Sequence, residues 1–297
     1  MFHQSVLLKE SVEGLAIRPD GIYVDATFGG GGHSAEILRK LETGRLFAFD
    51  QDSEAHKNII SDPHITMIRS NFRYIRNFLK LYKAVPVDGI LADLGVSSHQ
   101  IDDPERGFST RFEGGLDMRM DQKKSLTAKE IINQYSEEKL IGIFQVYGEL
   151  TNARKIARLI VTVRKEKEIV TTADLKNVLS NSCRKGHENK FFAQVFQAVR
   201  IETNQELDAL KDLLVQSVDI LKQGGRIVIL AYHSLEDRLV KDFFRSGNFN
   251  GEIQKDFFGN PVTPLRVINR KPIVANEKEV TENRRARSVR LRIAEKI

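Results

Sequence analysis

The sequence is poor in cysteine and in long apolar runs. Its 297 residues include one cysteine, Cys183, which excludes a disulfide framework and a cysteine-ligated zinc site and fits a reducing compartment. No apolar run approaches the ~18 residues that a membrane-spanning helix needs. Residues 1–10 have no basic segment followed by a long apolar core, so we expect no secretory signal. These absences predict a cytoplasmic protein with no membrane partner.

What the chain does have is an uneven distribution of positive charge. Its formal net charge is +6. Residues 265–297 alone hold 10 Lys and Arg against 4 Glu, a difference of +6, so the whole excess lies there. A local basic excess favours a polyanionic partner, with nucleic acid preferred because no basic amphipathic helix accompanies it. The alternative is a solvated basic strand.

The first part of the chain alternates short apolar strands with helical segments. Three of the four predicted strands end on an acid. This rhythm predicts an α/β fold with a parallel, doubly wound sheet. The strands are expected at 21–25, 45–50, 65–69 and 87–93, and the helices at 34–41, with Ser34 as N-cap, at 52–60 and at 72–82.

The strand pattern stops after residue 103. Residues 104–204 show a glycine-containing loop and then helical patterns, which predicts an inserted helical domain between two parts of one α/β domain, 1–103 and 205–297. After the insertion a helix is expected at 205–221, a strand at 226–231 and a helix at 234–244. The apolar residues around Arg290 and Arg292 predict an antiparallel edge strand with its basic face outward.

Four glycines, 29–32, join the first strand to the first helix. They allow close backbone approach to a ligand, and a helix start offers free N–H groups to an anion. A phosphate-binding P-loop would need Gly-Lys-Ser/Thr, and a dinucleotide fingerprint starting at Gly29 would need a third glycine or an alanine where Ser34 stands. We therefore favour a cofactor with an amino-acid carboxylate and no phosphate, S-adenosylmethionine, over a simple tight turn.

Acids and an aromatic side chain near the strand ends are the next candidates. Asp50 ends the second strand, where a carboxylate accepts both ribose hydroxyls, although it could instead cap the next helix. Phe72 could stack on adenine or belong to the core. Asp93 ends the fourth strand at the expected switch point of the sheet.

Two segments at the strand ends could hold a substrate. Residues 93–100 lack the Asp/Asn-Pro-Pro-aromatic motif of amino-group methyltransferases, which leaves the amino-holding groups open, but small residues beside an acid suit a flat base. In the second segment, 232–238, His233 could orient or deprotonate an amino group, while Ser234 and Glu236 could cap the following helix. No metal site is expected, because His33, His99 and His233 have no Cys or His partner at ligand spacing and methyl transfer needs no Lewis acid.

Seven segments together resemble one family, the ribosomal RNA small-subunit methyltransferase H family, also called MraW. The resemblance extends almost end to end. It rests on Thr-Phe-Gly-Gly-Gly-Gly-His-Ser (27–34), Asp-Leu-Gly-Val-Ser-Ser (93–98), Asp-Asp-Pro-Glu-Arg-Gly-Phe-Ser (102–109), Leu-Asp-Met-Arg-Met-Asp (116–121), Phe-Gln-Ala-Val-Arg-Ile (196–201), His-Ser-Leu-Glu-Asp-Arg (233–238) and Arg-Ala-Arg-Ser (285–288).

The resemblance implies a class I methyltransferase fold and methyl transfer from S-adenosylmethionine to N4 of a cytidine in the decoding region of 16S rRNA. It also implies a homodimer that acts on the small ribosomal subunit, with 104–204 as the substrate-recognition domain. One departure is His99, which stands where many members have proline. The implied cofactor contacts are Gly31, Gly32, His33, Asp50, Phe72, Asp93 and Gln100, with Asp93 and His233 as the candidate catalytic residues.

Two alternatives to the favoured function remain. One is a methyltransferase with another substrate, and the other is a non-catalytic RNA-binding assembly factor. Attack on carbon 5 of cytosine would need a cysteine nucleophile, and Cys183 lies far in sequence from both strand-end motifs.

Basic residues of two segments are the candidate phosphate contacts. They are Arg284, Arg285, Arg287, Arg290 and Arg292 near the C-terminus, and Arg154, Lys155, Arg158, Arg164 and Lys165 in the insertion.

Overall fold

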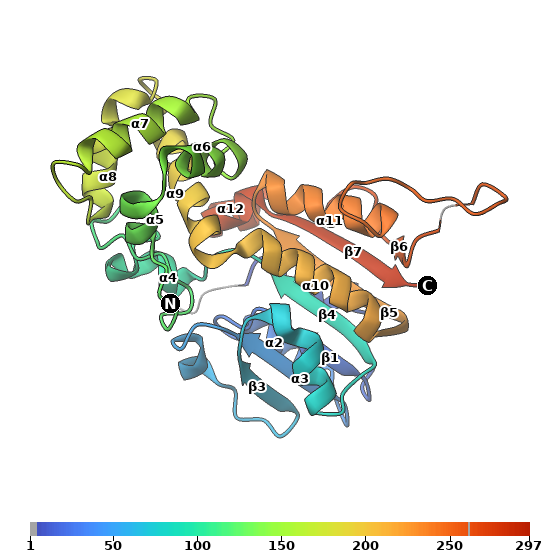
Figure 1. Ribbon diagram of the computed structural model, residues 1–297. Coiled ribbons are helices and arrows are strands. Elements are labelled where there is room, and N and C mark those ends of the chain that lie inside the picture. Colours follow the sequence, from blue (N-terminus) through green and yellow to red (C-terminus); the bar gives the residue numbers. More distant parts are fainter. Residues whose placement is uncertain (1–4, 261) are drawn as a thin grey trace. The chain divides into compact units, whose positions relative to one another are not determined.

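The computed structural model describes residues 5–260 and 262–297, which divide into two compact units (Figure 1). The first unit combines residues up to 95 with 207–297, and the second comprises 96–206. The inserted unit therefore begins at Val96 rather than at residue 104. The reason is that Val96 packs on the apolar core of the second unit.

A seven-stranded sheet forms the centre of the first unit. Its order is β3-β2-β1-β4-β5-β7-β6, and all pairs are parallel except β5 with β7 and β6 with β7. The predicted doubly wound, mostly parallel sheet is thus confirmed. The strands are β1 (Ile22–Asp25), β2 (Arg45–Asp50), β3 (Ile65–Arg69), β4 (Val87–Asp93), β5 (Leu221–Ala231), β6 (Leu265–Val267) and β7 (Arg290–Lys296).

Alternating side chains of these strands cover both faces of the sheet. On β2, Phe47 and Phe49 pack with α3, α10 and α11, whereas Leu46 points to the opposite core with α1 and α2. A strand buried on both faces is apolar at successive positions, which explains the continuous apolar runs of the sequence. The helices are α1 (Leu8–Gly14), α2 (Gly32–Leu38), α3 (Ile75–Leu81), α10 (Glu206–Ile220), α11 (Ser234–Ser246) and α12 (Glu277–Glu282).

Two local predictions for the first unit are wrong. Instead of a helix at 52–60 there is one 3₁₀ turn, η1 (Ala55–Asn58). The carboxylates of Asp50 and Asp52 accept backbone N–H groups two residues ahead, and such local bonds compete with helix formation. The last strand also differs, because β6 lies outside β7 and Arg292 on β7 is buried rather than exposed.

Helices make up most of the core of the second unit, and loop residues such as Leu116, Met118 and Ile169 complete it. Its longest helix, α9, contributes Val195, Ala198 and Val199 to a core shared with α5, α6, α7 and α8. Reciprocal side-chain caps start several of these helices, including Thr127 with Glu130 at α5. The elements are α4 (Ser98–Asp102), η3 (Pro104–Arg106), α5 (Ala128–Gln134), α6 (Glu137–Val146), α7 (Ala153–Val163), α8 (Thr172–Leu179), η4 (Ser180–Ser182) and α9 (Glu188–Asn204).

Shorter 3₁₀ turns connect further parts of the first unit, namely η2 (Phe72–Tyr74) and η5 (Arg284–Ser288). Across the described part of the chain, no helix is both long and apolar enough to cross a membrane.

Candidate functional site

The glycine loop between β1 and α2 has an open outer face. Gly29 and Gly31 have φ angles of +51° and +78°, a region that favours glycine. A Cβ atom on Gly30 would meet nothing within 4 Å, so a ligand can approach the backbone there. A Cβ atom on Gly31 would lie 2.9 Å from the Phe28 ring, and one on Gly32 would overlap the Ser5 hydroxyl.

Asp50 is anchored to this loop by its side chain. Its Oδ2 accepts the Gly29 N–H at 2.8 Å, and its Oδ1 accepts the Asp52 N–H at 2.8 Å. Burial raises the pKa of Asp50 to about 6, although both N–H groups act in the opposite direction. The carboxylate retains lone pairs for a ligand, and no α-helix follows it that it could cap.

Behind the loop lies a fully buried acid, Asp25, at the end of β1. Its Oδ2 accepts the Ser34 hydroxyl at 2.7 Å and its Oδ1 accepts the Thr27 N–H at 3.1 Å. Ser34 is therefore not the N-cap of α2, because Gly31 occupies that position. Burial raises the pKa of Asp25.

Asp93 is held from three sides at the end of β4. Its N–H donates to Thr27 Oγ1 at 2.6 Å, and its Oδ1 accepts the Tyr232 hydroxyl at 2.6 Å. Its Oδ2 lies 3.8 Å from Nδ1 of His33, and about a quarter of its side chain is exposed. Burial raises the pKa of Asp93, while His33 and the Tyr232 hydrogen bond lower it.

His33 links Asp93 to the segment before α1. Its Nε2 lies 3.2 Å from the carbonyl of Val6, which can only accept, so Nε2 carries the hydrogen. The ring is 4% exposed and lies between Asp93 and Val6. In the described structure His33 therefore supports the site from inside.

His233 begins α11 as its N-cap. Glu236 donates its N–H to Nδ1 of His233 at 3.4 Å, and its Oε2 accepts the Tyr232 N–H at 2.9 Å. Its Oε1 lies 3.2 Å from Nε2 of His233. The predicted cap at Glu236 is confirmed, but the capping residue is His233 rather than Ser234.

Phe72 and Gln100 are the two remaining predicted cofactor residues. Phe72 begins η2, packs against the core of the first unit and stays partly exposed. Gln100 belongs to the second unit, is 4% exposed and forms a capping box with Ser97 at the start of α4. Neither its backbone nor its side chain is in the first unit.

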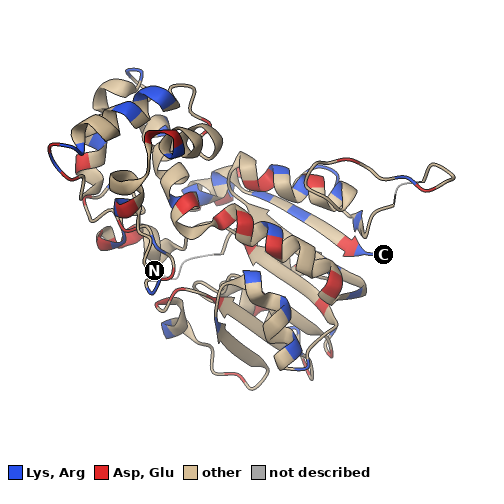
Figure 2. Ribbon diagram, in the orientation of Figure 1, with Lys and Arg blue, Asp and Glu red and all other residues tan. Residues whose placement is uncertain are grey.

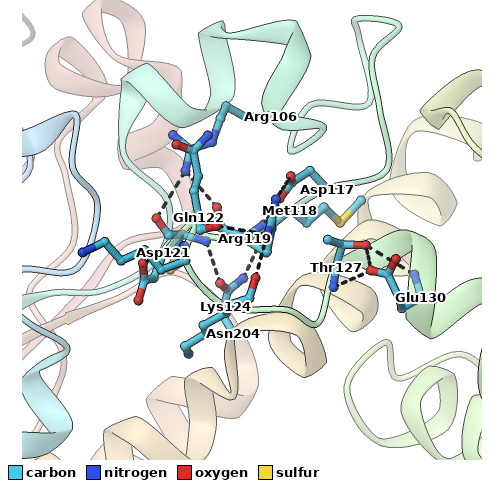
Figure 3. Close-up of polar contacts among 12 residues, drawn as sticks. Arg106, Asp117, Met118, Arg119, Asp121, Gln122, Lys124, Thr127, Glu130 and Asn204 are labelled. Atoms are coloured by element: carbon cyan, nitrogen blue, oxygen red, sulfur yellow. Dashed lines mark hydrogen bonds and ion pairs between the residues drawn. The ribbon is translucent and has the colours of Figure 1, made fainter.

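A loop of the second unit is fixed by two arginines (Figure 3). Arg119 forms a bidentate ion pair with Asp117, with distances of 2.9 and 2.7 Å, and donates to the carbonyls of Gln122 and Lys124. Arg106, 3% exposed, donates to the carbonyl of Arg119 at 2.8 Å. These contacts give the segment 116–121 a structural role.

Asn204 closes the same loop from the end of α9. Its Nδ2 donates to the carbonyl of Met118, and its Oδ1 accepts the Met120 N–H, both at 2.7 Å. Met118 has a φ angle of +57°, so its backbone lies in the left-handed region. The hydrogen bonds of Asn204 hold this strained position.

The C-terminal arginines have different environments. Arg284 and Arg287 on η5 are exposed, and Arg285 is half-buried. Arg290 and Arg292 both bind Asp237 of α11, with nearest distances of 2.8 and 2.6 Å, and Arg292 is buried. Arg292 therefore stabilises the packing of α11 on the sheet.

Three basic residues of α7, Arg154, Lys155 and Arg158, are exposed. Figure 2 shows where Lys and Arg lie along the ribbon of this helix. Nζ of Lys155 donates to the Asn181 carbonyl at 3.2 Å. Arg164 follows the helix and donates to the carbonyls of Ile132 and Tyr135, so it caps α5 rather than presenting a free charge.

Sequence analysis overlooked the contact between Tyr232 and Asp93 and the buried acid Glu236 as its anchor. The signal was present, because Tyr232 directly precedes the recognised segment 233–238. Nothing local, however, relates it to a residue 139 positions earlier.

The strand order 3-2-1-4-5-7-6, with an open glycine loop after β1 and an acid at the end of β2, defines a Rossmann-like fold of the class I methyltransferase type. The whole chain, residues 1–297, matches the MraW methylase family. The chain belongs to that family, as the resemblance implied.

Relatives of similar length show the same relationship. The chain is 56% identical over 297 residues to a protein of Phocaeicola vulgatus, covering 100% of this chain and 98% of that one. It is 55% identical over 297 residues to a protein of Flavobacterium johnsoniae, with the same coverage. Both are named ribosomal RNA small subunit methyltransferase H. A crystal structure of a putative rRNA methylase from Clostridium thermocellum aligns with a TM-score of 0.45 at 15% identity, covering 99% of this chain and 100% of that one.

Proposed function

We propose that this protein transfers a methyl group from S-adenosylmethionine to N4 of a cytidine in the decoding region of 16S rRNA. Membership of a methylase family and the names of the relatives support the general activity. The observation that carries the finer assignment is Asp93, a partly exposed, firmly held carboxylate at the end of β4.

The residues of the first unit fit the cofactor. The open backbone at Gly30 admits a ligand, and Asp50 presents a carboxylate beside it for the ribose hydroxyls. We assign Gly31, Gly32 and His33 to the shape of this loop, Phe72 to the adenine and Gln100 to a further contact. When bound, the cofactor supplies an activated sulfonium methyl group, so no covalent intermediate with the protein is required.

The chemistry that remains for the protein is to hold the amine and accept its proton. A carboxylate that accepts an amine N–H orients the nitrogen lone pair and takes up the proton released by methylation. Asp93 is suited to this role because its environment disfavours the charge. His233 is fixed by Glu236 and serves as a second candidate for orienting the base.

Two exposed basic segments are proposed as phosphate contacts. They are Arg284, Arg287 and Arg290 near the C-terminus, with the half-buried Arg285 beside them, and Arg154, Lys155 and Arg158 on α7. Arg290 also binds Asp237 but is exposed, whereas Arg292 is left out because it is buried against Asp237. Arg164 is left out because its guanidinium group binds backbone carbonyls. We further propose that the second unit recognises the RNA, that the protein is a cytoplasmic homodimer, and that the small ribosomal subunit is its partner.

Mapping of methylated nucleotides tests the substrate. In small-subunit rRNA from a strain that lacks this protein, one cytidine should lose its N4-methyl group, and the wild-type gene should restore it. A methyl group missing instead from carbon 5, from another nucleotide or from a protein would contradict the proposal. Full modification without the protein would favour the alternative of an assembly factor.

The variant Cys183→Ser tests the chemistry independently. The Cys183 thiol donates to the Ser180 carbonyl at 3.1 Å inside the second unit, and attack by an amine needs no thiolate. We expect the variant to retain methyl transfer. A covalent adduct with 5-fluorocytosine RNA that forms in the wild type but not in Cys183→Ser would overturn the N4 assignment.

A further inference from the structure

Tyr232 contacts the carboxyl group of Asp93 through its hydroxyl. It directly follows β5, and its N–H donates to Oε2 of Glu236, which is 2% exposed. Glu236 in turn belongs to the capping box that starts α11. The backbone of Tyr232 is therefore fixed at the junction between β5 and α11.

The phenol acts as a permanent hydrogen-bond donor. Its hydroxyl lies 2.6 Å from Oδ1 of Asp93. Burial and the neighbouring carboxylate raise the pKa of Tyr232 well above its ordinary value. The hydroxyl therefore keeps its proton at physiological pH, and Oδ1 of Asp93 always accepts it.

We propose that Tyr232 is a positioning residue for methyl transfer, which holds Asp93 in one orientation so that Oδ2 accepts the N–H of the reacting amine. The hydrogen bond from its N–H to Thr27 fixes the backbone of Asp93, and rotation of its carboxyl group would break the hydrogen bond between Oδ1 and the phenol. Oδ2 is the oxygen left for the substrate. As the nitrogen becomes methylated, one amine proton passes to Oδ2 and then to water.

The hydrogen bond also favours the ionised form of Asp93. Within residues 5–260 and 262–297, four groups act on the charge of this carboxyl: Asp25 at the end of β1, His33 on α2, Glu236 on α11, and Tyr232 itself. The two acids raise the pKa of Asp93, whereas His33 and the phenol lower it. Removing the hydroxyl removes one of the two stabilising partners of the charge.

The test is Tyr232→Phe, which keeps the ring and deletes the hydroxyl. This inference rests on the proposed function, so one readout uses no cofactor or RNA. In ligand-free protein labelled with ¹³C-aspartate, the Asp93 carboxyl, assigned with Asp93→Asn, should titrate at higher pH in the variant. With substrate, we expect kcat at neutral pH to fall about 10- to 100-fold, the loss expected for one hydrogen bond to a charged group. The acidic limb of the pH–rate profile should move to higher pH, with little change in KM for RNA.

Tyr23→Phe is the matched control. Tyr23 is buried, and its hydroxyl accepts the Arg18 N–H at 2.7 Å. This control should lower the unfolding temperature without moving the titration of Asp93 or the pH–rate profile. An unchanged Asp93 titration in Tyr232→Phe would overturn the positioning role. A shifted titration with unchanged activity would overturn it too and would also remove Asp93 from the proposed chemistry.

Discussion

The two units of this protein use buried charge in opposite ways. In the first unit, Asp25 and Asp93 lie near one another with no Lys or Arg bound to them in any described contact, and burial raises the pKa of both. In the second unit, burial would raise the pKa of Asp117 as well, but the bidentate Arg119 holds it below its ordinary value. In the first unit, burial makes the ionised form of these carboxyl groups unfavourable. In the second unit, the arginine stabilises the ionised form of Asp117.

This contrast separates residues that bind from residues that hold the fold. A carboxylate kept without a cation has a free capacity to accept a hydrogen bond or a proton, which a site needs. A carboxylate in a bidentate ion pair with an arginine already uses its oxygens to fix a loop, so it cannot serve a ligand in the same way. The pair of Asp237 with Arg292 shows that the first unit also contains the second kind.

The largest expected effect comes from removing the charge of Asp93. Asp93→Asn should lower the rate of methyl transfer by about 10³-fold, as expected for loss of a proton acceptor. Because burial disfavours the ionised form, the free energy of unfolding at neutral pH should not fall. Single-turnover rates and thermal unfolding of the same preparation measure both quantities. A fully active variant would contradict the role of Asp93 in methyl transfer, and an unfolded variant would show that Asp93 stabilises the fold instead.

Arg119→Ala should have the opposite effect to Asp93→Asn, because it should lower stability. It leaves Asp117 without its cation and frees the carbonyls of Gln122 and Lys124, so stability should fall by about 3 kcal/mol. Hydrogen exchange of α5 and α9 would report the loss within the second unit. Arg158→Ala is the control, since its exposed pair with Glu137 contributes about 0–1 kcal/mol. Equal losses in the two variants would contradict the structural role of Arg119.

Asp50 lies between these extremes, because it both anchors the loop and faces the proposed ligand. Asp50→Ala should weaken cofactor binding by about 2 kcal/mol, the contribution of a charged hydrogen bond. The pKa of Asp50 is raised to about 6, so its carboxylate is lost as pH falls below that value. Affinity measured by calorimetry should therefore drop about tenfold from pH 7 to pH 5 in the wild type, and stay flat over this range in the variant. A pH-independent wild type would exclude Asp50 as the ribose acceptor.

The smallest effect concerns the surface charges. Replacing Arg284 and Arg287 together by Gln should reduce the slope of log affinity for RNA against log salt by roughly 1.4, about 0.7 for each phosphate contact. Cofactor affinity should stay the same. The exposed residues Lys80 and Lys83 provide a matched double replacement that should leave the slope unchanged. If both pairs change the slope equally, η5 does not hold phosphate specifically.

Sequence predicts those features that depend on neighbouring residues. Asp50 and Asp93 were expected at strand ends because each follows its own apolar strand, and both lie there. The helix expected at 52–60 failed because the side chains of Asp50 and Asp52 bind backbone N–H groups that a helix would use. The helix propensities of single residues do not describe this competition between side chains and the backbone for the same N–H groups.

Features that join distant segments were beyond the sequence. Alternation around Arg292 predicts an exposed basic face, because nothing local shows that α11 supplies Asp237 to bury it. The contact of Tyr232 with Asp93 likewise requires β4 and β5 to be neighbours in the sheet. The start of the inserted unit differs from the expected residue 104 for the same reason. Val96 belongs to this unit because of its packing against distant residues, which its residue type does not reveal.

The insertion between β4 and β5 has a consequence for the order of folding during synthesis. When β4 has been made, its outer edge has no partner, because β5 begins only at Leu221. The second unit is contiguous in the chain and can form its own core during this interval. The sheet is completed only when β7 enters between β5 and β6. Asp25 and Asp93 are therefore made long before Tyr232, so the nascent chain holds the acids of the site well before it holds the residue that orients them.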